Sequence, residues 1–383
     1  MGGTKARKTT WATRLLIACM LCFGVACALG GCAQQEQEAT TDQSAEQSAQ
    51  SDQATKSETR MFTDSAGRTV EIPAQIDRIA PAGHTATQIL LTMAPEKMVT
   101  ISQELSDDQA KYLGADYASL PATGAAFGAK GDLNKEAVAA SGAQILIDTG
   151  ELKDGIAEDL DTMQEQLGIP VVVIETKMED YGAAYEMLGE LLGMEDRGKE
   201  LSDYCTAAYD KTVSVMKNIP DSERVNVAYL LGDKGTNTIA KDSYQGQVVD
   251  LVANNVADLG EVSGSGAGVE ISMEQLAVWN PQTILFAEDS IYDTVGSDAA
   301  FADLDAVKNG SYYEVPGTPW NWLNSPPTVN QVMGMQWLPR LLYPDQFDDS
   351  IYDVAKSYFK TFYHYDLSES EFNEIAANAQ PKA

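Results

Sequence analysis

Residues that could carry catalysis are scarce in this 383-residue sequence. A serine-histidine-aspartate triad needs a histidine beside its nucleophile, and the chain has only His84 and His364. The glycine-rich run at 264–268 lacks the lysine and the serine or threonine of a phosphate-binding loop. A zinc site needs several histidines or cysteines, and Cys205 is the only cysteine after Cys32. We therefore expect no enzyme, no catalytic residue, no cofactor and no protein-held metal ion.

Loops that follow short apolar runs hold the residues best suited to bind a ligand. Ligands of α/β proteins gather at the carboxyl ends of strands. Aromatic rings there stack on a large flat molecule, and lysines pair with its carboxylates. The candidates in these loops are His84, Thr85, Phe127, Lys130, Asp148, Lys234, Tyr244, Trp320 and Trp322.

Two kinds of candidate have an ordinary structural alternative. His84 could ligate a metal ion or haem, or it could be a loop histidine bonded to the backbone. Trp320 and Trp322 are two residues apart, so an extended loop would turn both to the same side. They either face the ligand or wedge beneath the turn at 326–327. His364 lies in an aromatic run, 358–365, that is typical of helix packing.

The first 31 residues have the composition of an export signal. They contain four basic residues and no acid, followed by an apolar run of about 15 residues and then Gly30-Gly31-Cys32. A spanning helix needs roughly 20 apolar residues, so an uncleaved anchor helix is the weaker reading. The stretch 29–32 resembles the lipobox of bacterial lipoproteins, which implies cleavage before Cys32 and a lipid on its sulfur.

Residues 32–59 follow as a polar segment with no aromatic residue and no aliphatic side chain larger than alanine after Cys32. Such a segment cannot bury enough apolar surface to fold, so we expect a disordered tether. As a random coil it spans roughly 30 Å on average.

The formal net charge of the chain is −31, and removal of the signal makes it more negative. Nucleic-acid binding needs basic surface, so the charge argues against a nucleic-acid partner. It also argues against a body that lies flat on anionic lipid, and it favours solubility.

The part after residue 60 is long enough for two domains, and short β runs alternate with helical stretches as in α/β folds. Strands are expected near 61–63, 69–72, 79, 98–101, 145–147 and 171–174, and again at 225–231, 238–240, 283–287 and 312–315. Between the two sets, the small and apolar residues from 196 to 217 recur with the period of one helix face. The predicted domains are an N-terminal lobe at 60–195, a connecting helix at 196–220 and a C-terminal lobe at 221–383.

Two segments repeat the same order of elements. Asn134-Lys135-Glu136 leads to an apolar strand at 145–147, and Ser272-Met273-Glu274 leads to another at 283–285. Each reads as a capped short helix, a turn and a buried strand, which suggests two equivalent halves. Near the end of the chain, Ser368 and Glu371 form the pattern of a capping box.

Several of these segments together match a known family. The stretch 62–73 (FTDSAGRTVEIP), the stretch 77–80 (DRIA), the two glutamate units and the tail 320–338 resemble the iron-siderophore, haem and cobalamin class of ABC-transporter substrate-binding proteins, class III of the periplasmic binding proteins. The resemblance covers residues 60–376. It implies two α/β lobes joined by one long helix, with the ligand between them.

The resemblance also implies partners and a location. It predicts a monomeric lipoprotein on the outer face of the cell membrane, or on the periplasmic side in a double-membrane bacterium, that delivers its ligand to a permease and its ATPase. Glu136 and Glu274 would dock into the permease, although a carboxylate near a helix N-terminus also has a purely capping role. The expected ligand is a metal chelate, first a ferric siderophore, with haem, a corrinoid or an oxyanion such as molybdate open. A ligand sensor for a membrane receptor and a surface-attached hydrolase are the alternatives from other classes.

Overall fold

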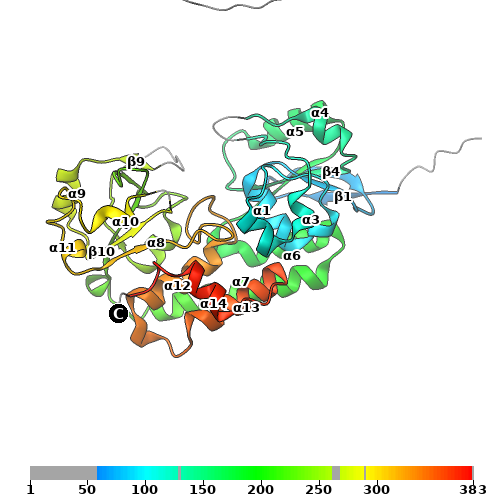
Figure 1. Ribbon diagram of the computed structural model, residues 1–383. Helices are drawn as coiled ribbons and strands as arrows, with labels where there is room; N and C mark the ends of the chain where they lie inside the picture. Colours follow the sequence, from blue (N-terminus) through cyan, green and yellow to red (C-terminus); the bar gives the residue numbers. More distant parts are fainter. Residues whose placement is uncertain (1–57, 128–130, 261–267, 289, 382–383) are drawn as a thin grey trace, which may run out of the picture. The chain divides into compact units, whose positions relative to one another are not determined.

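The protein is represented by a computed structural model that describes residues 58–127, 131–260, 268–288 and 290–381 (Figure 1). The predicted signal, Cys32 and nearly all of the tether lie outside the described residues. All described residues belong to one compact unit, Thr55–Ala383. None of the helices in the described ranges has the length and apolarity that a membrane crossing requires.

The first two predicted strands form a hairpin, which consists of β1 (Thr59–Thr63) and β2 (Thr69–Pro73). The turn between them places Gly67 at a φ of 77°, in the left-handed region that glycine enters without steric cost. The carboxylate of Asp64 accepts hydrogen bonds from the backbone N–H groups of Ala66 and Arg68 and so fixes the turn. β1 begins one residue inside the predicted tether.

The first sheet is parallel, with the order β3 (Ile79–Pro81), β4 (Ile145–Gly150), β5 (Val171–Glu175). Alternate residues of β4 face opposite layers: Ile145 and Ile147 pack with α1 (His84–Met93) and α6 (Tyr181–Leu192), and Leu146 packs with α4 (Lys135–Ala140) and α5 (Ile156–Leu167). The prediction of a strand at 98–101 was wrong, because Met98 and Ile101 form only isolated bridges. The short helix η1 (Pro95–Lys97) precedes these two residues, and α2 (Asp107–Leu113) and α3 (Ala115–Ala118) lie between them and α4.

The second sheet has the strand order β11 (Tyr312–Glu314), β10 (Thr283–Phe286), β6 (Asn226–Leu231), β7 (Asn237–Thr238) and β9 (Val269–Glu270). A further short strand, β8 (Asn254–Asn255), also pairs with β6. β11, β10 and β6 are parallel to one another. One face packs with α9 (Met273–Trp279), α10 (Tyr292–Val295) and α11 (Asp305–Lys308), and the other packs toward α8 (Gln247–Val252) and α12 (Gln331–Leu342). The fold is therefore α/β with a second layered sheet, as predicted.

The long helix predicted between the two sets of strands is α7 (Glu195–Met216). It follows α6 directly, and η2 (Met178–Asp180) precedes that pair, while η3 (Asp221–Glu223) follows it. Three glycines bring the backbones of α6 and α7 close together: Gly182, Gly189 and Gly198. A Cβ atom at Gly198 would lie 2.6 Å from the carbonyl oxygen of Tyr185.

We expect Gly198→Ala to destabilise the protein. In a helix, alanine is favoured over glycine by about 1 kcal/mol, because glycine loses more backbone entropy on folding. Overpacking of a tight contact costs about 1–3 kcal/mol. The free energy of unfolding in urea should therefore fall, by up to about 2 kcal/mol. Ser214→Ala, on the exposed side of the same helix, serves as the control and should change it little. A Gly198→Ala variant more stable than the parent would contradict this packing.

The last helices return to the first half of the chain. They are α13 (Ile351–Tyr363) and α14 (Glu369–Ile375), preceded by η4 (Pro344–Gln346). α13 contacts α1 and α2, and its Phe362 meets Tyr204 of α7 edge to face at 5.2 Å between ring centroids. His364 ends α13 as its left-handed cap. The predicted capping box of Ser368 and Glu371 is confirmed at the start of α14.

The repeated units also fold as expected (Figure 1). The Asn134 side chain accepts a hydrogen bond from the backbone N–H of Ala137 and begins α4, which leads to β4. The Ser272 hydroxyl does the same for Gln275 and begins α9, which leads to β10. Each unit thus places its glutamate, Glu136 or Glu274, second in a short helix that leads into an inner strand of its sheet.

Candidate functional site

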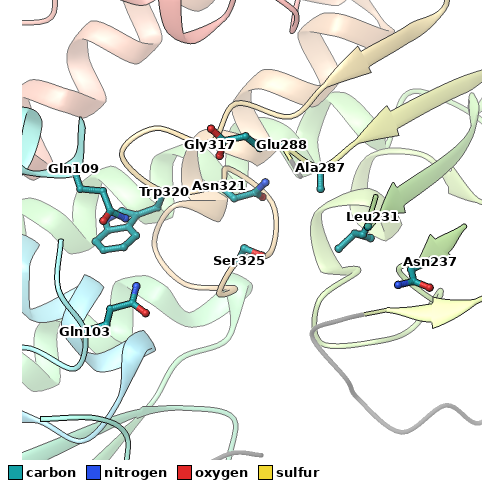
Figure 2. Close-up of a pocket in the computed structure, with 11 residues that line it drawn as sticks. Gln103, Gln109, Leu231, Asn237, Ala287, Glu288, Gly317, Trp320, Asn321 and Ser325 are labelled. Atoms are coloured by element: carbon teal, nitrogen blue, oxygen red, sulfur yellow. The ribbon is translucent and has the colours of Figure 1, made fainter. Parts of the chain in front are cut away.

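Two cavities lie at the carboxyl ends of the parallel strands, where α/β proteins place their ligands. The larger one, here the Trp320 cavity, has a volume of about 550 Å³. Residues that end or follow β6, β10 and β11 line one side of it, and a loop after α1 together with α2 supplies the rest (Figure 2). Its lining is Gln103, Gln109, Leu231, Gly232, Asn237, Ala287, Glu288, Gly317, Trp320, Asn321 and Ser325.

The loop that carries Trp320 is held by buried asparagines. The Asn321 Oδ1 atom accepts hydrogen bonds from the backbone N–H groups of Leu323 and Asn324, at 2.9 and 3.1 Å. The Asn330 amide donates in turn to the carbonyl oxygen of Asn321. Because these bonds satisfy the turn from inside the protein, the backbone that presents Trp320 and Ser325 to the cavity is fixed before any ligand arrives.

Trp320 lines the cavity while its side chain is mostly covered. Its exposed fraction is 5%, and its indole N–H has no hydrogen-bond acceptor among the described residues. Next to it, the Gln109 amide donates to the carbonyl oxygen of Pro319 at 3.1 Å, which joins α2 to the loop. In Figure 2, Trp320 lies with Gln103 and Gln109 on one side of the cavity.

Among the described residues that line the Trp320 cavity, Glu288 is the only charged one. Its carboxylate packs against Gly317, where a Cβ atom would collide with it. Glycine at 317 thus leaves the space that the carboxylate occupies. The side chain of Glu288 is otherwise solvent-exposed.

The second cavity, here the His84 cavity, has a volume of about 400 Å³. It lies at the ends of β3 and β4 and at the first residues of α1, and Tyr244, Gln245 and Pro326 close it from the second half of the chain. The two cavities meet at one peptide bond, since Ser325 lines the first and Pro326 the second. Five of the sequence candidates line this cavity together: His84, Thr85, Phe127, Asp148 and Tyr244.

Hydrogen bonds orient these side chains. His84 Nδ1 lies 2.9 Å from the Ser102 hydroxyl, and the Thr85 hydroxyl donates to the carbonyl oxygen of Thr149 at 2.6 Å. The Tyr244 hydroxyl donates to the carbonyl oxygen of Thr176 at 2.9 Å. This last bond links a loop of the second half to the end of β5 in the first sheet.

Burial changes the protonation of two groups in the His84 cavity. Burial raises the pKa of Asp148 to about 7, with the Thr149 backbone N–H and Lys153 acting against it. Burial also lowers the pKa of His84, against the attraction of Asp132. At neutral pH His84 is therefore largely uncharged, and Asp148 is protonated in a large fraction of molecules.

Two other candidates, Trp322 and Lys234, line neither cavity. Trp322 is 1% exposed and packs edge to face on Trp337, at 6.1 Å between ring centroids, so the expectation that it faces the ligand with Trp320 was wrong. Lys234 is exposed but lines neither cavity. Lys130 lies outside the described residues.

Among the polar residues that line the Trp320 cavity, the sequence reasoning missed Gln103, Gln109, Asn237 and Ser325. All are small or amide side chains without a spacing motif. The only signal for Gln109 was its place in a capping box with Ser106, which identifies a helix start and not a ligand contact. In the described ranges, no three His, Cys, Asp or Glu side chains come together as they would around a metal ion.

Glu136 and Glu274 lie away from both cavities, on the outer helices α4 and α9, and both are exposed. The backbone N–H of Glu274 itself, helped by the Ser272 hydroxyl, lowers the pKa of the Glu274 carboxyl. That carboxylate is therefore charged at neutral pH.

Comparison with solved structures shows the same fold elsewhere. A solute-binding protein of an ABC transporter from Sulfurospirillum deleyianum matches with a TM-score of 0.76 at 24% identity, over 82% of this chain and 98% of that one. A periplasmic solute-binding protein from Veillonella parvula matches with a TM-score of 0.67 at 22% identity, over 84% and 98%. The molybdate-binding protein of a Haemophilus influenzae ABC transporter matches with a TM-score of 0.64 at 19% identity, over 81% and 99%.

No curated protein is similar enough to this sequence to count as a relative. The sequence model of one family, described as periplasmic binding protein, matches residues 96–319, which is more than half of the chain and includes β4 and β5 of the first sheet and the strands of the second. The chain therefore belongs to the periplasmic binding protein family, the extracytoplasmic solute-binding proteins that serve ABC permeases and their ATPases.

Proposed function

We propose that this protein is a surface lipoprotein that captures a metal chelate, first a ferric siderophore, and delivers it to an ABC permease. The observation that carries the proposal is the Trp320 cavity, because it is lined from both halves of the described chain and sits at strand ends of the second sheet. Its volume of about 550 Å³ falls within the usual range of sites for molecules of drug size. An aromatic ring and several amides at its wall suit a ligand with flat and polar parts.

A thermal-shift screen of the mature chain tests the ligand class. The probes are ferric siderophores, haem, cobalamin and molybdate, the last because the similar Haemophilus influenzae protein is bound to molybdate. A ligand at 100 times its dissociation constant stabilises the native state by about 2.7 kcal/mol, which raises the melting temperature of a chain of this size by roughly 5 °C. If no chelate raises it, the proposed ligand class is wrong, and a shift with molybdate alone would replace it with an oxyanion.

Trp320 should report ligand binding by its fluorescence. It lines the cavity, whereas Trp322 and Trp337 pack on each other in the core. We expect the chelate that gives the largest thermal shift to quench the emission of the parent protein, and Trp320→Phe to lose most of that change. Trp322→Phe is the matched control and should keep it. An unchanged response in Trp320→Phe would place the ligand elsewhere.

The delivery step and the membrane attachment are part of the same proposal. Glu136 and Glu274 are its docking residues because each is exposed at the same position of a repeated unit, one beside each sheet. Cys32 is its lipid attachment residue because it ends a signal-like segment and precedes a polar stretch. Permease docking also separates this function from that of a ligand sensor, which would bind its ligand without supporting uptake.

A further inference from the structure

The polar side chains of the Trp320 cavity are almost all uncharged. Amide groups come from Gln103, Gln109, Asn237 and Asn321, and Ser325 supplies a hydroxyl. Amides both donate and accept hydrogen bonds, and a hydroxyl does the same. The amides of Gln109 and Asn321 already bond to the protein backbone. Gln103, Asn237 and Ser325 are therefore the groups best placed to satisfy neutral carbonyl, hydroxamate or amide groups of a ligand without an ion pair.

The indole of Trp320 adds a donor that the described residues leave unpaired. An N–H group that stays buried without an acceptor costs stability, and a ligand that offers an oxygen there recovers that loss. Indole donates one hydrogen bond and accepts none. A ligand atom that reaches this N–H must be an acceptor, and a neutral carbonyl or hydroxamate oxygen is sufficient.

The charge at the Trp320 cavity is negative. Neither lysine nor arginine nor histidine is among its described lining residues, and Glu288 contributes a carboxylate. The segment that provides Gln103 and Gln109 also carries Glu104, Asp107 and Asp108, all exposed. An anionic ligand would lose part of its hydration here and would meet only like charges, which costs affinity.

The His84 cavity does not supply positive charge that would offset the negative charge at the Trp320 cavity. Lys153 is the one cation of its described lining, and Glu151 and Asp148 lie in the same lining. Burial lowers the pKa of His84, so its ring adds little positive charge at neutral pH. The chain as a whole is strongly acidic, at −31, so its long-range field also disfavours the approach of anions.

We propose that the ligand carries no net negative charge, and that it is a neutral or singly cationic chelate whose outer surface is rich in amide or hydroxamate oxygens. This inference rests on the proposed capture of a metal chelate and narrows it. It excludes tris-catecholate and carboxylate-rich chelates as the preferred cargo. Glu288 serves as the residue that favours a cationic ligand over an anionic one.

Three ferric chelates of different charge test the proposal on the full mature protein. Ferrichrome is a neutral tris-hydroxamate, ferrioxamine B is a singly cationic one, and ferric enterobactin is a triply anionic tris-catecholate. Dissociation constants come from calorimetric titration at neutral pH. We expect at least one of the two hydroxamates to bind about 100-fold or more tightly than the catecholate, since each uncompensated negative charge near a carboxylate lowers affinity by roughly tenfold.

A single substitution then tests the role of Glu288. Glu288→Gln keeps the shape and removes the charge, so binding of ferrioxamine B should weaken about threefold and binding of ferrichrome should change less than about twofold. Glu223→Gln removes an equally exposed carboxylate that lines neither cavity, and it should change neither constant. The melting temperatures of both variants without ligand show whether folding is intact.

The outcomes separate this inference from the function on which it rests. If ferric enterobactin binds as tightly as the hydroxamates, the charge class is overturned and chelate capture stands. If none of the three chelates binds, chelate capture fails and the inference fails with it. If Glu288→Gln and Glu223→Gln weaken ferrioxamine B equally, Glu288 has no selective role and only the general charge of the protein acts.

Discussion

Replacing both Glu136 and Glu274 by lysine is expected to abolish uptake of the ligand while leaving its binding unchanged. Both carboxylates are exposed, and neither lines a cavity. Each occupies the second position of a helix that begins at a side-chain cap, one beside each sheet. A partner that must recognise both halves at once can do so through these two charges, and reversal of both turns attraction into repulsion.

Stability does not explain such a loss. Both carboxylates are exposed, and solvent and salt screen the interaction of an exposed charge with a helix dipole, so reversal of the two charges costs little stability. Globular proteins have about 5–15 kcal/mol of stability, and the folded population would hardly change. Ligand titration and the melting temperature of the purified variant measure this directly.

A matched pair of charge reversals serves as the control. Glu158 and Asp293 are exposed acids in the first turns of α5 and α10, helices that flank the same faces of the two sheets as α4 and α9. Glu158→Lys with Asp293→Lys gives the same change in net charge and should leave uptake within about twofold of the parent, because rim charges contribute little unless they meet a partner. Normal uptake by the Glu136 and Glu274 double variant would show that these residues only cap their helices.

The elements with strong local signals were predicted from the sequence. The period of the apolar residues predicted α7, and the cap residues Asn134, Ser272 and Ser368 predicted the helix starts that follow them. The apolar runs of β4, β5, β6 and β10 are buried on both faces and stand out for that reason. The segment 98–101 has the same composition but pairs only at isolated bridges, because composition alone does not provide a neighbouring strand.

Among the ligand candidates, too, some placements followed from the sequence and others depended on contacts that the sequence does not show. His84, Thr85 and Asp148 were predicted to lie together because strand ends meet at one edge of a parallel sheet. Trp320 and Trp322 were predicted to lie together because a loop was treated as extended. The side chain of Asn321 instead bonds to the backbone of residues 323 and 324 and turns the chain between the two rings. A side-chain-to-backbone turn of this kind depends on burial, and local spacing does not reveal it.

The amide residues of the Trp320 cavity show a second limit. Gln103 and Gln109 come from the first half of the chain, while Asn237 and Ser325 come from the second. These residues are far apart in the sequence, and no motif links them. Glutamine and asparagine are also common on any protein surface, so their presence alone does not indicate a site. Only the structure shows that they line one cavity, because the packing of α2 against the loop at 316–330 forms that cavity.

Cys32→Ala is expected to abolish membrane attachment. The lipid on the sulfur is the proposed anchor, and its hold on the membrane grows with the number of buried methylenes in its acyl chains, at about 0.8 kcal/mol for each one. Cells grown with labelled palmitate should incorporate label into the parent protein and none into the variant. Uptake should fall strongly, because a tether that spans roughly 30 Å holds the parent beside its permease and the variant lacks that restraint.

Cys27→Ala is the matched control, since it removes a cysteine from the apolar run five residues earlier. It should retain the label, because only the cysteine at the cleavage point is modified. The amino-terminal residue of the purified parent, read by mass spectrometry, should be a modified Cys32. A labelled Cys32→Ala protein would refute the attachment residue. A parent chain that keeps its first 31 residues would instead mean that the apolar run itself holds the protein at the membrane, although about 15 residues fall short of the roughly 20 that span a bilayer.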